Sequence, residues 1–141
     1  MLEGSCACGR VLFIQHDGSP GDNFAPSTPG WSLLKSIQRS PSDAVLRKSL
    51  NDAFHGTSLQ ADLEQLEVGR LLVTGWATDL CVDATVRSAA ALGFQVVVVA
   101  DAHTVSDRPH LEARQVIEHH HWVWRNLIAK HQVALSDEVE L

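Results

Sequence analysis

The sequence lacks the features of several broad classes of protein. Acidic residues outnumber basic ones by 17 to 11, and a net charge of −6 gives no support for binding to nucleic acid or to an anionic membrane. No apolar run approaches the roughly 20 residues that a membrane-spanning helix needs, and no segment resembles a signal peptide. Three cysteines, two of them in one short CAC segment, are poor material for a disulfide framework. We therefore expect a cytoplasmic protein without nucleic-acid or membrane partners.

The length and composition predict one globular domain. The chain has 141 residues, of which 45% are hydrophobic, so it can bury a sizeable core. Internal repeats and low-complexity segments are absent from the sequence. We therefore predict a single domain over residues 1–141.

The stretch 71–102 has the pattern of a strand–helix–strand unit. Apolar and β-branched residues at 71–74 and 96–100 are typical of strands that are buried on both faces of a parallel sheet. Between them, residues 79–92 have apolar side chains at helical spacing. Gly93 follows as the expected left-handed residue at the end of the helix. This unit is the centre of the predicted fold.

The rest of the chain continues the alternation of strands and helices. We predict further strands at 11–15, 44–47 and 132–135, and further helices at 31–37, 59–66 and 109–128, with Pro109 in the first position of the last helix. Residues 18–30 are rich in Gly, Pro, Ser and Asn and predict a long loop. The pattern predicts an α/β fold: a Rossmann-like, three-layer α/β/α arrangement with a mainly parallel sheet.

Cys81 is the first candidate for chemistry, because it lies in the first turn of the predicted central helix. The N–H groups and the dipole at a helix start favour the thiolate, which is the reactive form. In a parallel sheet, residues just past the strand ends share one rim. That rim would gather His16, Asp17, Lys48, residues 75–81 and residues 101–103. A lysine ammonium would further favour the thiolate, although a cysteine in a helix can also be a small buried residue of the core.

Four segments carry a resemblance to a known family. GWATDLCV at 75–82 and VVVVADA at 96–102 resemble the nucleophile core of the isochorismatase-like cysteine hydrolases. Upstream, RKSLNDAFHGTSL at 47–59 resembles the catalytic-lysine segment of that family, and VLFIQHDG at 11–18 resembles its second strand.

The resemblance implies that the protein hydrolyses a small molecule at an amide-type C–N bond, as nicotinamidase-like enzymes do. It implies Cys81 as the nucleophile, and Lys48 as support for the thiolate and the intermediate. The backbone N–H groups of Ala77 and Cys81 would form the oxyanion hole, and the Trp76–Ala77 peptide bond would be cis. It implies no cofactor.

One part of the family pattern is missing from this sequence. The family has a first strand, in a segment like LLVIDVQ, that ends in the aspartate of the catalytic triad. We therefore expect a chain that lacks this strand and part of the first helix. Asp17 lies on the same predicted rim and is a weak candidate for the missing carboxylate. The alternative is an impaired or non-catalytic member of the fold that serves in binding or assembly.

The remaining candidates have simpler interpretations. Phe54 and Trp76 flank the predicted pocket and are either substrate walls or core residues. The run His119–His121 predicts a solvated helix face, since neighbours on a helix point in different directions. HDGSPGDNF at 16–24 lacks the spacing of the nicotinamidase metal site, so we expect no metal. We expect a homo-oligomer, with Trp122, Trp124 and Leu127 in helix packing or subunit contacts, and with Cys6 and Cys8 in a loose terminus.

Overall fold

The computed structural model describes residues 10–138, so the expectations for Cys6 and Cys8 lie outside the described residues. The chain divides into two compact units, Met1–Ser49 and Leu50–Leu141, and each is described by itself. None of the helices within residues 10–138 is long and apolar enough to cross a membrane.

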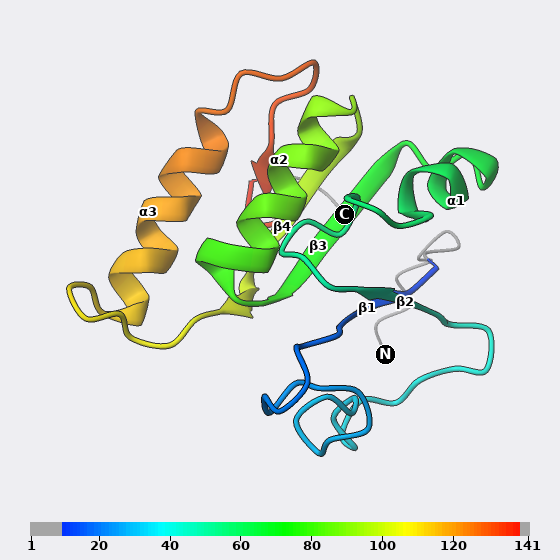
Figure 1. Cartoon of the computed structure of the whole chain (residues 1–141). Helices are drawn as coiled ribbons and strands as arrows, with labels where there is room; N and C mark the ends of the chain where they lie inside the picture. The colour runs from blue at the N-terminus through cyan, green and yellow to red at the C-terminus, as the bar shows by residue number, and fades with distance from the viewer. Residues whose placement is uncertain (1–9, 139–141) are drawn as a thin grey trace, which may run out of the picture. The chain divides into compact units, whose positions relative to one another are not determined.

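The first unit is built on two parallel strands. β1 spans Leu12–His16 and β2 spans Ala44–Lys48, and the pairing runs in register from Leu12 opposite Ala44 to His16 opposite Lys48. A long loop joins them (Figure 1). The Asp22 carboxylate accepts hydrogen bonds from the backbone N–H groups of Ser19 (2.7 Å) and Phe24 (2.6 Å), which fix one turn of this loop.

The helix predicted at 31–37 is wrong, because this segment forms successive turns. The Trp31 N–H donates to the Thr28 carbonyl at 3.2 Å and the Ile37 N–H to the Leu34 carbonyl at 3.0 Å, and no regular helical ladder follows. A seven-residue helix is marginal in water unless one face is buried. The Leu34 side chain is 70% exposed, so packing does not supply that stabilisation.

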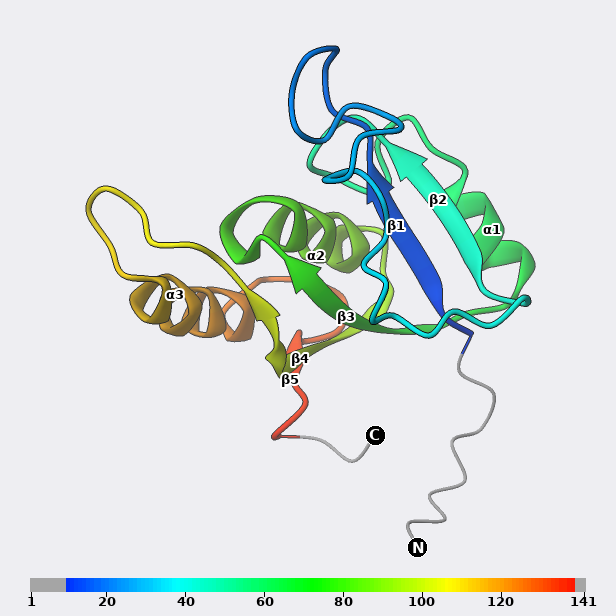
Figure 2. The ribbon, with the colours of Figure 1, turned by 90° about the horizontal axis from the view of Figure 1, so that it is seen from below.

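The second unit holds a three-stranded parallel sheet. Its elements are α1 (Leu59–Gln65), β3 (Arg70–Trp76), α2 (Asp83–Ala91), β4 (Gln95–Thr104), α3 (Ala113–Arg125) and β5 (Ala134–Leu135). The strand order is β3-β4-β5, with α2 and α3 as the crossovers that parallel neighbours need. Both crossover helices lie on the same face of this sheet (Figures 1 and 2).

The core of the second unit lies between that sheet face and the two helices. It contains the fully buried side chains of Val86, Val96, Val98, Trp124 and Leu135. Gly93 has φ +89° directly after α2, and its N–H donates to the Ala90 carbonyl at 3.1 Å. The left-handed residue predicted at this helix end is therefore confirmed.

The start predicted for the last helix is wrong. α3 begins at Ala113, whereas Pro109 lies in a turn that Arg108 and Leu111 close with an N–H to carbonyl bond of 2.8 Å. The fixed φ of proline suits the second position of a turn as well as the first turn of a helix. The true start carries a capping box, in which the Glu112 N–H donates to the Gln115 side chain at 3.0 Å.

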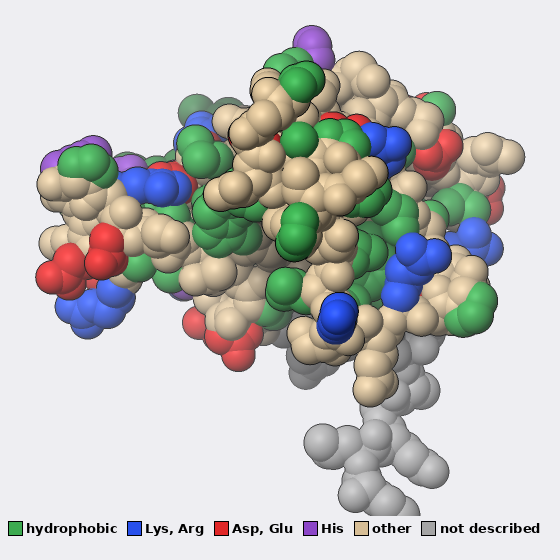
Figure 3. Space-filling view, turned by 60° about the horizontal axis from the view of Figure 1, so that its bottom comes forward, with side chains coloured by type: hydrophobic (Ala, Val, Ile, Leu, Met, Phe, Trp, Pro, Cys, Tyr) green, Lys and Arg blue, Asp and Glu red, His purple; other side chains and the backbone are tan. Residues whose placement is uncertain are grey.

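The α/β class with parallel strands and flanking helices is confirmed. Within residues 10–138, the strands form two separate ladders, β1-β2 and β3-β4-β5. One edge of β1 and one edge of β3 therefore have no ladder partner in the described part of the chain. Acidic and basic side chains are scattered in small groups over the face that Figure 3 shows.

Candidate active site

The residues around Cys81 form one tight turn at the end of β3, which we call the cysteine turn (residues 77–82). The Trp76–Ala77 peptide bond is cis, and residues 78–82 form a single π-helical turn that continues into α2. The N–H groups of Leu80 and Val82 both donate to the Ala77 carbonyl, each at 3.1 Å. Ala77 is buried in an apolar cluster with Val105 and Val116, so the turn is anchored where it leaves the strand.

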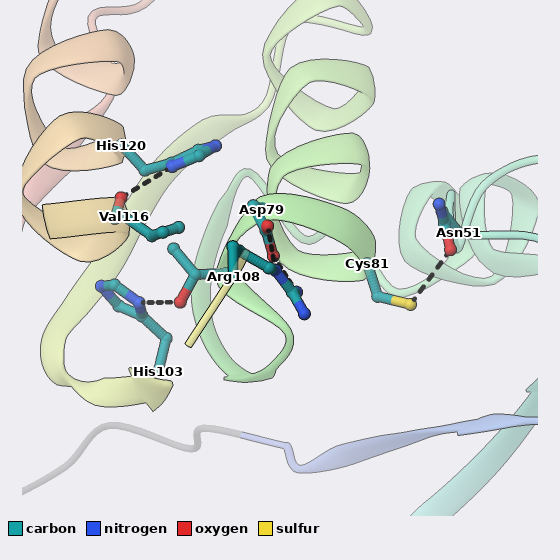
Figure 4. A network of polar contacts seen from close by, with 8 residues as sticks. Asn51, Asp79, Cys81, His103, Arg108, Val116 and His120 are labelled. Atoms are coloured by element: carbon teal, nitrogen blue, oxygen red, sulfur yellow. Dashed lines mark hydrogen bonds and ion pairs between the residues drawn. The ribbon is translucent and has the colours of Figure 1, made fainter. Parts of the chain in front are cut away.

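The Cys81 side chain points toward the loop that precedes α1 (Figure 4). Its thiol donates to the Asn51 side-chain oxygen, with 3.6 Å between Sγ and Oδ1, and the residue is half-buried. The π-helical turn places Cys81 two residues ahead of α2, at the start of the helical run that the sequence predicted. Asn51 was not among the predicted site residues, although it lies in the segment 47–59 that carried the family resemblance.

Two polar contacts hold the loop that contains Asn51 against α2, and a ring contact holds it against the residue that precedes β4. The Ala53 N–H donates to the Thr85 hydroxyl at 3.1 Å, and the Ser88 hydroxyl donates to the Asp52 carboxylate at 2.6 Å. The Phe54 ring stacks on Phe94, with 5.9 Å between the ring centroids. This contact favours the core interpretation of Phe54. Trp76, the other predicted pocket residue, is 52% exposed at the end of β3.

A bidentate ion pair holds the cysteine turn from the loop before α3. Arg108 donates from Nε to Asp79 Oδ2 at 2.8 Å and from Nη2 to Oδ1 at 2.6 Å (Figure 4). The hydrogen bonds from Arg108 hold the pKa of Asp79 below its usual value. Asp79 is two residues from Cys81, so this pair restrains the backbone next to Cys81 directly.

A second restraint comes from β4, through an irregularity in its pairing with β3. Val73 lies opposite Val98 and Gly75 lies opposite His103, so two steps along β3 match five steps along β4. The predicted strand 96–100 therefore continues to Thr104, and His103 reaches the cysteine turn. The His103 Nδ1 and the Thr78 hydroxyl are 2.9 Å apart, and both residues are buried.

The solvated face predicted for the histidine run is wrong for two of its three members. His121 Nε2 lies 2.9 Å from His103 Nε2, and the His120 Nδ1–H donates to the Val116 carbonyl at 2.8 Å, whereas His119 is exposed. Burial is the largest cause that lowers the pKa of His103 to about 4, followed by the neighbouring His121 and His120. The spacing of the run on a helix could not reveal the contact between His121 and His103, because that contact depends on the irregular pairing of β4 with β3.

The start of α2 is tied to α3 by Trp124. This indole is fully buried, and its Nε1–H donates to the Asp83 carboxylate at 2.9 Å. The predicted role of Trp124 in helix packing is confirmed, whereas Trp122 is 63% exposed. Asp83 also pairs with Arg87 at 2.8 Å, one turn along α2.

Lys48 and Asp17 belong to the first unit. Lys48 is the last residue of β2 rather than the residue after it, and its carbonyl accepts from the Asp17 N–H at 2.7 Å. The Asp17 carboxylate binds Arg47 at 2.8 Å and accepts from the Trp31 Nε1–H at 2.7 Å. The hydrogen bond from Arg47 is the largest cause that lowers the pKa of Asp17. The approach of Lys48 to Cys81 stays a prediction.

The sequence model of the isochorismatase domain matches residues 7–128, which contain all of these predicted site residues. The chain belongs to the isochorismatase family. It is 42% identical over 99 residues to streptothricin hydrolase from Streptomyces noursei, covering 70% of this chain and 36% of that protein. It is 30% identical over 117 residues to ureidoacrylate amidohydrolase RutB from Methylorubrum extorquens, covering 82% of this chain and 47% of that protein.

The fold comparison agrees with the sequence comparison. The crystal structure of an isochorismatase-family protein from Chromobacterium violaceum matches with a TM-score of 0.74 at 30% identity, covering 88% of this chain and 65% of that one. The isochorismatase-like fold of this chain is thereby shown. The chain spans less than half the length of the two curated relatives named above.

Within residues 10–138 of this isochorismatase-family chain, no group of three or more His, Cys, Asp or Glu side chains is placed to hold a metal ion. Two contacts to the cysteine turn were missed at the level of sequence, those of Asn51 and Arg108, whereas His103 lies in the segment 101–103 that was predicted on the same rim. Each comes from a segment distant in the chain, and the oppositely charged pair of Asp79 and Arg108 was the only signal available in the sequence.

Proposed function

We propose that this chain carries the nucleophile site of a hydrolase that cleaves an amide-type C–N bond of a small molecule, with Cys81 as the nucleophile. The observation that carries the proposal is the position of Cys81. It lies in a tight turn that follows the cis Trp76–Ala77 bond and opens α2, inside the region that matches the isochorismatase domain. The name of the amidohydrolase relative supports the reaction class.

The reaction that this site would perform has two stages. The Cys81 sulfur attacks the carbonyl carbon, a C–S bond forms, and the carbonyl π electrons move to the oxygen. The backbone N–H groups of Ala77 and Cys81 would stabilise that oxyanion. When the oxygen electrons return, the C–N bond breaks and the amine leaves with a proton. Water then attacks the thioester, which releases the carboxylic acid and restores the thiol.

The restraints on the cysteine turn suit this role. Asp79, Thr78 and Asp83 are each held by a side chain from β4, from α3 or from the loop between them. A nucleophile held in one geometry loses less entropy when it reaches the transition state. The Cys81 thiol donates to the Asn51 side-chain oxygen, which comes from the loop before α1. The side chains that restrain Thr78, Asp79 and Asp83 come from other segments.

The two charged residues that the family resemblance and the predicted rim bring to this reaction, Lys48 and Asp17, lie in the first unit. Lys48 would favour the thiolate and stabilise negative charge on the intermediate. Asp17 is a poor general acid at neutral pH, because its carboxylate is ionised in the pair with Arg47. We therefore assign proton delivery to no residue of this chain, and we expect turnover to be slow by roughly 10²–10⁴ relative to a complete acid–base site.

Ammonia release tests the proposal. The chain is incubated with nicotinamide, as a primary carboxamide, and with ureidoacrylate, as a carbamoyl compound. We expect slow ammonia release from at least one of them, abolished by Cys81→Ala and kept by the control Cys8→Ala. Ammonia release that survives Cys81→Ala would overturn the assignment of the nucleophile. A chain inactive on both compounds whose Cys81 also resists acylation would overturn the hydrolase proposal.

A further inference from the structure

We propose that His103 is a positioning residue for the cysteine turn. It would act through Thr78. The hydrogen-bonded chain Thr78–His103–His121 would open when His103 and His121 are both protonated. The inference rests on the proposed function only in taking Cys81 as the reactive group. The network lies wholly within the second unit. Two hydrogen bonds define it, between Thr78 and His103 and between His103 and His121.

Thr78 is the link between the network and the reactive segment. Its side chain is fully buried, it directly follows Ala77, and it begins the π-helical turn that contains Cys81. A buried hydroxyl without a partner is costly, so its contact with His103 Nδ1 at 2.9 Å contributes to the choice of this turn conformation. Replacing the hydroxyl with a methyl group would leave the His103 nitrogen without that partner.

The geometry of the histidine pair limits how many protons it can hold. The two Nε2 atoms are 2.9 Å apart, so one N–H lies between them and the other nitrogen must accept. If His103 supplies that N–H, its Nδ1 accepts from the Thr78 hydroxyl. If His121 supplies it, the His103 Nδ1–H donates to Thr78. One extra proton on either ring keeps this contact, because the other Nε2 can still accept. When both rings are imidazolium, an N–H faces an N–H and the contact is lost.

The surroundings keep the pair unprotonated at neutral pH. Burial, and then the nearby His121 and His120, lower the pKa of His103 to about 4. The Trp124 ring also lies against His103, with 5.1 Å between the ring centroids. Burial and then Arg125 lower the pKa of His121. Three carboxylates oppose this shift, one on α3 and two after β5: Glu118, Asp137 and Glu138.

His103 cannot act on a substrate directly. Figure 4 shows His103 and Cys81 on different sides of the cysteine turn, with the Asp79–Arg108 pair between them. Its influence on the reactive sulfur must therefore pass through the backbone of residues 78–81. This distinguishes a positioning residue from a catalytic one, and it predicts an effect on Cys81 reactivity without any contact to the alkylating reagent.

The test compares the rate at which iodoacetamide alkylates Cys81, followed by peptide mass spectrometry from pH 3.5 to 8. Thr78→Val removes the hydroxyl, Thr78→Ser keeps it, and Thr104→Val is a matched control at an exposed position of β4. At pH 7 we expect Thr78→Val to react between about twofold and tenfold more slowly, the range that one hydrogen bond is worth. The other two variants should stay within about twofold of the wild type.

The pH profile separates positioning from simple packing. The ratio of the wild-type rate to the Thr78→Val rate cancels the ordinary titration of the thiol. We expect this ratio to stay constant down to about pH 5 and to fall toward one as the pH approaches 4, because His103 takes up its proton near that pH and the network of the wild type then opens. A ratio that is constant with pH, or a Thr78→Val rate equal to the wild type at pH 7, would overturn the proposal.

A second variant covers the case in which Thr78→Val does not fold. His121→Asn keeps a hydrogen-bonding group but cannot take up a proton. It should match the wild type at pH 7 and react faster than the wild type at pH 4, where His103 of the wild type is about half protonated, and a rate no faster at pH 4 would overturn the proposal. If wild-type Cys81 reacts no faster than Cys6 or Cys8, the proposed function fails. The positioning role of His103 is judged separately, from the ratio of the wild-type rate to the variant rate at Cys81.

Discussion

The buried state of His103 predicts a loss of stability in mild acid. The residue is 5% exposed and its pKa is lowered from 6.5 to about 4. Because the unfolded chain binds the proton more readily, stability is complete above about pH 6.5 and falls as the pH decreases toward 4. Each tenfold change in proton affinity is worth about 1.4 kcal/mol, so the full coupling is about 3 kcal/mol, of which about 2 kcal/mol is lost between pH 7 and pH 5.

Carboxylates affect the same property in a separate pH range. The lowered pKa values of Asp79 and Glu138 add stability that is lost only as the pH falls below their ordinary values of 3.8 and 4.5. Between pH 4.5 and 6.5, the predicted loss of stability therefore comes from the protonation of histidine. His121 contributes in the same direction, because its pKa is also lowered.

Urea unfolding at pH 7 and pH 5 measures this loss, with His103→Gln as the test and His131→Gln, at an exposed position, as the matched control. We expect the free energy of unfolding of the wild type and of the control to fall by at least about 2 kcal/mol between the two pH values. The fall should be smaller in His103→Gln by about that amount. An equal fall in all three proteins would refute the reasoning from burial.

Three further predictions concern the cysteine turn and the start of α2. Asn51→Asp should slow alkylation of Cys81 at least about fivefold, since two like charges about 4 Å apart repel by about 1 kcal/mol even in water; Asn51→Ala is the control, and a rate unaffected by the carboxylate contradicts the contact. A double-mutant cycle of Asp79→Asn and Arg108→Gln should give a coupling of about 1–2 kcal/mol in urea unfolding, and no coupling would contradict the bidentate pair. Trp124→Phe should lower the free energy of unfolding by about 1–3 kcal/mol through loss of its indole N–H contact, and an unchanged stability would contradict that contact.

The strands and the position of Cys81 at the start of a helical run were predictable because their signals are local. Apolar runs placed the strands near 71–74 and 96–100 within a few residues, and Gly93 marked the end of the helix between them. Cys81 was identified because the helical pattern of residues 79–92 and the family resemblance of residues 75–82 both indicated this position. These features depend on neighbours in sequence, which pattern reasoning can use.

The errors and omissions arose where distant segments decide the outcome. Pro109 fits a turn and a helix start equally well, and the Arg108–Leu111 contact selects the turn. The histidine run looked like a solvated helix face because the bulge that brings His103 against His121 has no sequence signature. The turns at 31–37 reflect a segment that has too little buried surface to form a helix.

Acylation of Cys81 tests the central claim most directly. The chain is treated with p-nitrophenyl acetate at neutral pH, and the acetyl group is located by peptide mass spectrometry while p-nitrophenolate release is followed. We predict a rapid release of about one equivalent, with the acetyl group on Cys81 as a thioester. Cys81→Ala should lose the rapid phase and Cys8→Ala should keep it. An acetyl group that accumulates on Cys6, Cys8 or a lysine, with Cys81 unmodified, would contradict the account.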